Sequence, residues 1–320
     1  MLAQQVCRRR GDKLPGRVVE ISGEPRYLGL QRGSMVVSDK ETELGRIDLD
    51  NVLSIVLTSR GAMLTSALIN ETSERNIPII VCNDKFHPVS LITPLIHHND
   101  QHVRYEAQVI AKKGVNSKVW KWVVSSKVNN QFELLKIHHS SSSERLKRLS
   151  MEIKPGDPKN VEAQAAQVYW PALFGRDFRR DRNTDGINSL LNYGYTIIRS
   201  SMLRAILASG LHPTFGVFHK NKRNGLCLVD DLMEPYRPIV DQVVKQLELK
   251  GVTTLTAETK RCLASIVAAD QVGFGSVSPM FRHMQQFSYD LSQLYQGQNI
   301  KFNPPKLLSE LEVSAIVALC

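Results

Sequence analysis

Three segments that lie far apart in the sequence carry residues whose types suit chemistry on a phosphodiester. Glu162 lies near the start of NVEAQAAQVYWPALFG, and His219 ends GLHPTFGVFH. Glu234 lies in DDLMEPYRP, where Asp231 is a further acid. Two carboxylates and one imidazole suit Mg²⁺ or Mn²⁺. Such an ion can activate a hydroxyl nucleophile and stabilise the charge that builds up on a phosphodiester. The residues alone therefore predict a basic, helical protein with metal-dependent phosphodiester chemistry.

Each of these residues also has a structural explanation, which the spacing leaves open. Glu162 could be a first-turn glutamate that the helix dipole and an Asn160 cap favour. A histidine followed by lysines, such as His219, is often solvated at the surface. Glu234 could form a local ion pair with Arg237. Pro235 and Pro238, which follow Glu234, nevertheless predict a rigid bend, and rigid presentation suits a metal site.

Basic residues flank the acids and could contact phosphates. We expect DNA binding by Arg176, Arg179, Arg180, Arg182, Lys220, Lys222 and Arg223. A further basic set lies on the preceding helices and comprises Lys118, Lys121, Lys127, Arg145, Lys147 and Arg148. Such runs are otherwise typical of a solvated helix face. Trp120, Trp122 and Tyr169 could stack on bases, although core positions are more typical of such residues.

Composition excludes several classes of protein. The chain has 320 residues, with 41 Lys plus Arg against 31 Asp plus Glu, and the net charge of +10 favours a polyanionic partner. No apolar run approaches the roughly 18 residues of a membrane span, and the N-terminus lacks the apolar core of a signal peptide. Five scattered cysteines without a CxxC pair indicate neither a disulfide framework nor a zinc site. We therefore expect a cytoplasmic protein.

Walker, GxGxxG, GxSxG and HExxH motifs are absent, so nucleotide hydrolysis, dinucleotide redox chemistry and serine hydrolysis have no support.

The pattern predicts an α+β chain with two domains. The pattern of residues 17–92 predicts mostly strands with one short helix. After residues 95–101, the spacing of apolar residues changes from a period of two, typical of strands, towards 3.6, typical of helices. We expect a small β-rich N-terminal domain (1–96), a linker (97–102) and a larger all-α catalytic domain (103–320). The predicted helices of the second domain are 103–113, 116–138, 143–152, 160–174, 186–209, 238–249, 256–269 and 278–296. The apolar tail SAIVALC is expected to pack or to form a subunit contact.

Together these segments resemble a known family. VEAQAAQVYWPALFG, LLNYGYTIIRSSMLRAILASGLHPTFGVFH and LVDDLMEPYRPIVD are similar to the catalytic core of the CRISPR-associated adaptation integrase. That protein is the large, metal-dependent subunit of the spacer-acquisition complex. Order, spacing and the preceding β domain match over nearly the whole chain. The segments DLMEPYRP and YWPALFG resemble the corresponding segments in one branch of this family, which accompanies a single-protein, RNA-guided effector nuclease.

The resemblance implies roles for individual residues. The first metal-binding glutamate of the family, in E-G/A-x-A-A-x-x-Y, falls on Glu162. Its histidine falls on His219, and its second acid, in D-L-M-E-P, falls on Glu234. Asp231 matches an additional acid near the site. Ala163 stands where a glycine is common, which is a mild departure that a helix tolerates.

The implied reaction is a pair of transesterifications, in which the 3′-OH ends of a short captured double-stranded DNA attack phosphodiesters at the two edges of a repeat. The implied catalytic and metal-binding residues are Glu162, His219 and Glu234, with Mg²⁺ or Mn²⁺. The family implies a homodimer, with dimerisation through the N-terminal domain, and a heterohexamer with a smaller CRISPR-associated adaptation subunit. The effector nuclease is a further possible partner, and no membrane is implied. Two alternatives stay open: a structure-selective metal-dependent DNA nuclease, and a non-enzymatic, architectural DNA-binding protein.

Overall fold

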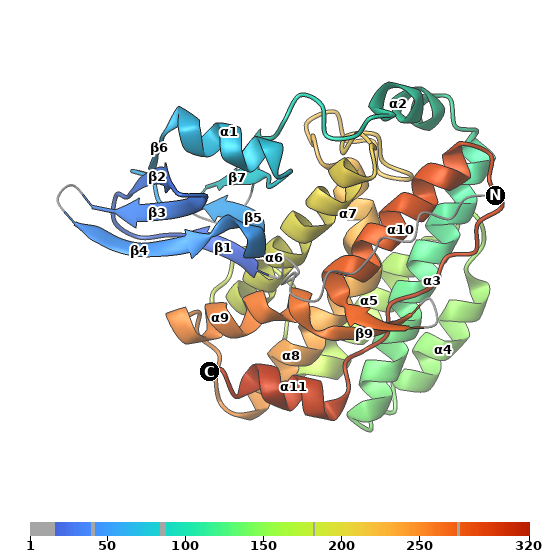
Figure 1. Ribbon diagram of the computed structural model, residues 1–320. Coiled ribbons are helices and arrows are strands. Elements are labelled where there is room, and N and C mark those ends of the chain that lie inside the picture. Colours follow the sequence, from blue (N-terminus) through green and yellow to red (C-terminus); the bar gives the residue numbers. More distant parts are fainter. Residues whose placement is uncertain (1–16, 40–41, 84–87, 182, 274–275) are drawn as a thin grey trace.

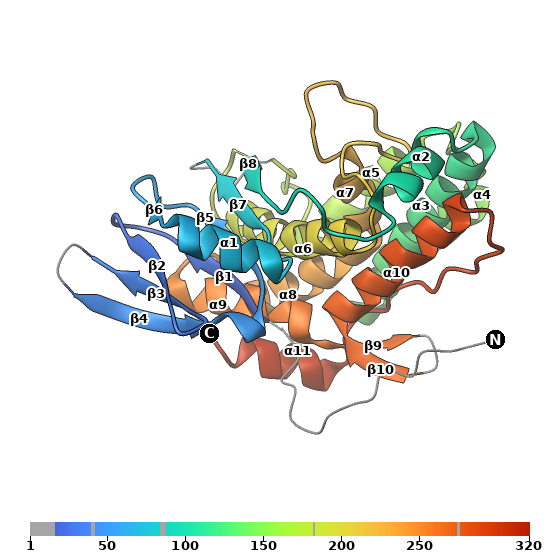
Figure 2. The ribbon, with the colours of Figure 1, turned by 45° about the horizontal axis from the view of Figure 1, so that its top comes forward.

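Strands gather at one end of the molecule and long helices at the other (Figures 1 and 2). The computed structural model describes residues 17–39, 42–83, 88–181, 183–273 and 276–320. The order of elements confirms the expected fold class, a β-rich N-terminal region followed by a larger, mostly helical region. The proposed division into two domains with a linker at 97–102 stays a prediction.

One four-stranded sheet packs against the helices. Its strands, in spatial order, are β1 (Arg17–Ile21), β5 (Val52–Leu57), β7 (Ile79–Cys82) and β8 (Pro88–Ile92). The first three pair in parallel, whereas β8 returns antiparallel to β7. Every residue of β5 is buried, as is typical of a strand covered on both faces. Leu53 and Val56 join the helical core, while Val52 and Ile55 join the core of the β region.

A second sheet extends away from the helices (Figure 1). In spatial order its strands are β4 (Glu43–Asp48), β3 (Ser34–Ser38), β2 (Tyr27–Gln31) and β6 (Met63–Leu64). The β2–β3 hairpin turns at Arg32 and Gly33, whose φ angles of 50° and 75° match a tight turn of the kind that glycine favours. The helix α1 (Ser66–Glu74) begins after a Thr65 cap and leads into β7, so it forms the crossover between the parallel strands β5 and β7.

The helical region is built around one long central helix, α6 (Ile187–Ala208). It contacts α7, α8, α9 and α10, and also β1 and β5, so it joins the two regions. The other elements are α2 (Gln101–Val109), α3 (Lys113–Ile137), α4 (Ser143–Glu152), α5 (Val161–Phe174), α7 (Cys227–Met233), the 3₁₀ turn η2 (Glu234–Tyr236), α8 (Arg237–Leu249), α9 (Ala257–Ser265), α10 (Met280–Tyr295) and α11 (Glu310–Val317). Among the described residues, no helix is both long and apolar enough to cross a membrane.

The structure adds elements that the sequence pattern does not predict. α7 is absent from the predicted helices, because the prolines that follow it suggest an irregular segment. A short antiparallel hairpin, β9 (Asp270–Gly273) and β10 (Ser276–Pro279), interrupts the otherwise helical region. The apolar tail packs as expected: α11 buries Val313, Ile316 and Val317 against α8 and α9.

A buried glutamate holds the β region against the helices. Glu20 on β1 accepts hydrogen bonds from Tyr193 Oη on α6 (2.9 Å) and from Lys260 Nζ on α9 (2.9 Å). The Glu20 side chain is only 10% exposed. A hydrogen-bonded carboxylate in this setting fixes the register between β1 and the two helices.

Candidate active site

Glu162 is placed by the first turn of α5. The turn is capped by Asp157, whose two carboxylate oxygens accept from the backbone N–H groups of Val161 (2.8 Å) and Glu162 (3.0 Å). Asn160, the cap that the sequence suggests, makes no such hydrogen bond and has a left-handed φ of 51°. Farther along α5, Tyr169 is fully buried. The helix therefore anchors its far end in the core and presents Glu162 at its start.

Glu234 is placed by a single 3₁₀ turn between two helices. α7 ends at Met233, and the 3₁₀ turn that follows contains Pro235 before α8 begins. The backbone stays in the right-handed helical region from Met233 to Arg237, so the prolines change the hydrogen-bond pattern of the turn, and the rigid bend stays a prediction. Glu234 is buried, and its Oε1 lies 2.8 Å from Arg237 Nε, which is the local ion pair that the spacing suggests. Burial would raise the pKa of Glu234, but the charges of Arg237 and Lys127 hold it below its ordinary value.

The two glutamates face one lysine. Lys127 Nζ on α3 lies 2.6 Å from Glu162 Oε1 and 2.6 Å from Glu234 Oε2. These two oxygens are therefore no farther apart than twice 2.6 Å. The Lys127 side chain is only 12% exposed, and although burial disfavours its charged form, Glu234 and Glu162 hold its pKa above the ordinary value. A residue that the sequence places in a solvated basic set is thus an internal cation.

His219 is oriented by a buried acid. It lies in the loop between α6 and α7, and its Nδ1 lies 2.5 Å from Oδ1 of Asp231, a fully buried residue of α7. The backbone N–H of Phe218 donates to Asp231 Oδ2 (2.8 Å). Gly216 makes this fit possible, since a Cβ there would lie 2.5 Å from the His219 carbonyl oxygen. The Asp231 hydrogen bond raises the pKa of His219 against the effect of burial, and the charges of Asp231, Glu162 and Glu234 act in the same direction.

The three expected metal ligands share one neighbourhood without forming a closed ligand set. Among the described residues, no group of three or more His, Cys, Asp and Glu side chains is close enough to hold an ion. The donor set nevertheless fits a divalent cation. Glu234 Oε2 is buried and pairs with Lys127 Nζ at 2.6 Å, so both glutamates present an oxygen to one cation. His219 keeps Nε2 available, because Nδ1 is engaged with Asp231. The role of Glu162, His219 and Glu234 as ligands stays a prediction.

A second cluster of polar residues lies beside the glutamates, and the sequence analysis missed it. Asp241 on α8 is buried and accepts from the hydroxyl groups of Tyr169 and Tyr195. The guanidinium carbon of Arg237 lies 4.6 Å from the centre of the Tyr195 ring. No spacing signal connects these positions, since α5, α6 and α8 bring them together only in the folded chain.

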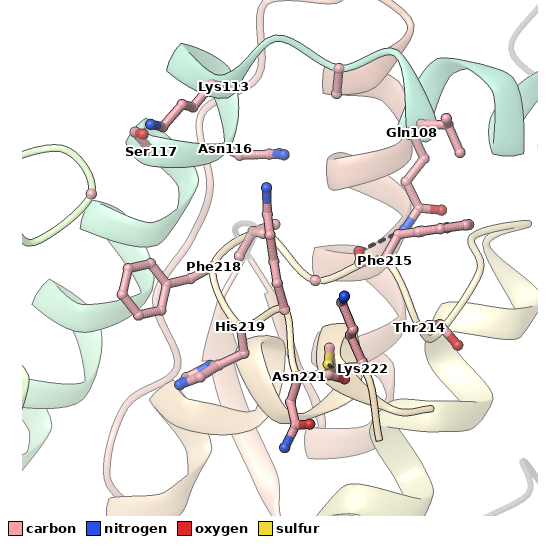
Figure 3. Close-up of a pocket in the computed structure, with 17 residues that line it drawn as sticks. Gln108, Lys113, Asn116, Ser117, Thr214, Phe215, Phe218, His219, Asn221 and Lys222 are labelled. Carbon is pink, nitrogen blue, oxygen red and sulfur yellow. Dashed lines mark hydrogen bonds between the residues drawn. The ribbon is translucent and has the colours of Figure 1, made fainter. Parts of the chain in front are cut away.

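A basic cavity opens beside His219 (Figure 3). It has a volume of about 750 Å³ and lies between α3, which contributes Lys113 and Asn116, and the loop that carries His219. Its lining includes Lys220 and Lys222 but no carboxylate of the described residues. Two aromatic side chains in the same lining, Phe215 and Phe218, are 46% and 43% exposed. Phe218 also stacks on buried Trp120, with ring centres 4.4 Å apart.

The residues expected to bind DNA differ in their surroundings. Most are exposed, namely Arg176, Arg179, Lys220, Lys222 and Arg223. Arg180 instead donates to the side-chain oxygens of Asn188 (2.9 Å) and Asn192 (2.7 Å). Arg182 lies outside the described residues. Contact with DNA stays a prediction for all of them, and for Arg180 it would require these internal hydrogen bonds to break. Trp120 and Tyr169 are core residues, as the structural explanation predicts.

Comparisons with known proteins agree on one family. The protein-family model described as CRISPR associated protein Cas1 matches residues 19–263. The CRISPR-associated endonuclease Cas1 of Neisseria meningitidis serogroup C is 30% identical over 225 residues, which cover 70% of this chain and 73% of that protein. Two solved structures share the fold. A casposase bound to integration product has a TM-score of 0.72 at 18% identity and covers 92% of this chain and 94% of its own. A chain of a Cas6-RT-Cas1–Cas2 complex has a TM-score of 0.73 at 17% identity, covering 89% of this chain and 35% of that one.

Proposed function

The chain belongs to the CRISPR-associated protein Cas1 family of endonucleases and integrases, and on this premise we propose that it joins short captured DNA to a CRISPR repeat array by metal-dependent transesterification. The observation that carries the proposal is the convergence of Glu162 and Glu234 on one buried point beside His219. Their donor set suits Mg²⁺ or Mn²⁺.

In the proposed step, the 3′-oxygen of the captured DNA forms a bond to phosphorus in the repeat, and the bond from that phosphorus to the repeat's own 3′-oxygen breaks. The attacking hydroxyl loses its proton to solvent, and the released 3′-oxygen takes up a proton to become a hydroxyl. The bound ion would polarise the attacking hydroxyl and neutralise charge on the phosphate. Glu162 and Glu234 would hold it with their carboxylates, and His219 with Nε2. Asp231 fixes the orientation of that imidazole by accepting from Nδ1, which is the usual arrangement around a metal-binding histidine.

The basic cavity beside His219 supports the choice of DNA as substrate. Lys113, Lys220 and Lys222 supply positive charge from two sides of the cavity, and the exposed rings of Phe215 and Phe218 offer surfaces for bases. We propose that one DNA strand reaches the site through it. The overall charge of +10 favours the approach of DNA.

The proposal extends to partners. A structure with the same fold is named as a Cas1–Cas2 complex, which supports a Cas2-like protein as the smaller subunit. We propose a homodimer that contacts double-stranded DNA and forms a heterohexamer with this subunit. The effector nuclease is proposed as a further partner on the strength of the segments DLMEPYRP and YWPALFG.

Strand transfer tests the proposal directly. The chain and its small subunit are incubated with Mn²⁺, short duplexes and a supercoiled plasmid that carries the repeat. We expect covalently joined products, and a loss of joining by at least about 100-fold in Glu162→Ala, His219→Ala and Glu234→Ala with DNA binding kept. Glu133→Ala, an exposed carboxylate on α3, is the matched control and should join normally.

Other products would identify the alternatives. Cleavage without joining would support a structure-selective nuclease that uses the same residues with water as nucleophile, an outcome consistent with the name endonuclease of the Neisseria relative. Full activity in all three alanine variants, together with loss of function on changing exposed Arg179, would point to a non-enzymatic DNA-binding protein and refute the metal site.

A further inference from the structure

Lys127 occupies the position that a metal ion would need. Its ammonium group contacts one oxygen of Glu162 and one of Glu234, each at 2.6 Å. An ion bound to both oxygens would lie roughly 2.0–2.6 Å from each. Oxygens separated by no more than twice 2.6 Å cannot hold both cations between them. An ion that binds between these two oxygens therefore requires the ammonium group to leave.

The structure contains a place for the displaced ammonium group. Lys127 lines a cavity of about 220 Å³ together with Gln131, Trp170 and Asp241, and this volume is several times the ~30 Å³ that a water molecule occupies. Gln131 lies four residues after Lys127 on α3, so the two side chains share a helix face. The flexible four-carbon stem of lysine allows its head to move between two sites.

Gln131 supplies the acceptor for that second position. Its side chain is only 2% exposed, and its Oε1 is buried without a hydrogen-bond partner among the described residues. A buried unpaired acceptor is costly unless a donor reaches it in some state of the protein. An ammonium group that turns away from the glutamates would satisfy this oxygen.

We propose that Lys127 is a two-position internal cation: it neutralises Glu162 and Glu234 in the metal-free protein and moves towards Gln131 when a divalent ion binds. The proposal rests on the metal site of the proposed function. It assigns Lys127 as a positioning residue that keeps the two carboxylates facing each other before the ion arrives. It also predicts that the ion and the ammonium group compete.

Mn²⁺ binding measured by calorimetry tests the competition. Lys127→Met keeps an unbranched stem of four heavy atoms and removes the charged ammonium group, so we expect its Kd for Mn²⁺ to be about tenfold lower than that of the wild type. Gln131→Leu removes the second position and should raise the Kd by about three- to tenfold. In the double variant the Gln131→Leu change should have no effect, because no ammonium group needs the acceptor. Lys121→Met, an exposed lysine on the same helix, is the control and should bind like the wild type.

Thermal unfolding gives a second readout that does not depend on catalysis. In EDTA, Lys127→Met should melt below the wild type because two buried carboxylates face each other unscreened, and Mn²⁺ should raise its Tm more than that of the wild type. If the variant is unfolded in EDTA, Mn²⁺ should restore its folding. A variant that stays unfolded in saturating Mn²⁺ contradicts the exchange.

The outcomes separate this inference from the proposed function. The metal site itself is wrong if the wild-type protein does not bind Mn²⁺. It is also wrong if Glu162→Gln and Glu234→Gln bind Mn²⁺ as well as the wild type does. If that binding is present but Lys127→Met binds no more tightly than the wild type, only the exchange is wrong. An effect of Gln131→Leu that persists in the Lys127→Met background also overturns the second position.

Discussion

Burial changes the pKa of the Asp241 carboxyl group, which lies on α8 beside the candidate site. Burial raises the pKa of Asp241 from 3.8 to about 6, although the hydroxyl groups of Tyr195 and Tyr169 and the charges of Arg180 and Arg237 act in the opposite direction. The carboxyl group therefore binds its proton more strongly in the folded state than in the unfolded state. Its contribution to stability is complete below pH 3.8 and is lost as the pH rises through about 6.

This residue makes a pH-dependent prediction. We expect the free energy of unfolding of the wild type, relative to Asp241→Asn, to fall by up to about 3 kcal/mol between pH 4 and pH 7. The reason is that only the wild type acquires a buried charge over this range. Urea unfolding of both proteins at several pH values measures the difference. A difference between the two proteins that does not change with pH would contradict the assignment.

At the scale of elements, the start of α5 decides where Glu162 lies. Asp157 holds the first turn with two hydrogen bonds to backbone N–H groups. We expect Asp157→Ala to lower the free energy of unfolding by about 1–2 kcal/mol and to reduce strand transfer, because the turn that carries Glu162 frays. Urea unfolding and the plasmid assay provide the two measurements. Asn160→Gly keeps a residue that tolerates the left-handed φ of 51°, so its stability should match the wild type within about 0.5 kcal/mol.

The same helix shows what sequence can predict. Its apolar periodicity and the glycine after it place α5 within one residue of the expected range 160–174, and the long helix α6 is placed equally well. The sequence favours Asn160 as the N-cap of α5, because Asn is common at that position. In the structure, Asp157 instead accepts from the backbone N–H groups of Val161 and Glu162. Side-chain reach of this kind depends on loop geometry, which local pattern does not encode.

The internal position of Lys127 does not follow from the local sequence. Its neighbours in the sequence suggest a basic helix face, and its two partners lie 35 and 107 positions away in the numbering of the chain. Only the packing of α3 against α5 and η2 makes it internal. The parallel pairing of β1, β5 and β7 and the hairpin β9–β10 were missed for the same reason, because pairing between strands depends on contacts far apart in sequence.

At the scale of the whole molecule, α3, α5 and α7, which carry or adjoin the candidate site, belong to the helical region (Figure 1). Glu162, His219, Glu234 and Lys127 come from α5, the loop before α7, η2 and α3, and Asp231 on α7 orients the histidine. The β region reaches the site through α6, which contacts β1 and β5 on one side and α7 and α8 on the other. It also reaches the site through β7 and β8, which line one pocket with the loop before α7. A change at Glu20, which links β1 to α6 and α9, can therefore show whether the two regions unfold together or separately.

Glu20→Ala removes an acceptor that Tyr193 and Lys260 share across this junction. We expect the free energy of unfolding to fall by about 1–3 kcal/mol, since a half-buried ammonium group and a tyrosine hydroxyl lose their carboxylate partner. Hydrogen exchange should speed up in β1 and α9 before it does in α5, because the β region loosens first. Glu24→Ala, an exposed glutamate four residues farther along the chain, should leave both measurements unchanged. Equal acceleration of exchange in β1 and α5 would instead mean that the two regions open together, with the packing of α6 rather than Glu20 controlling their separation.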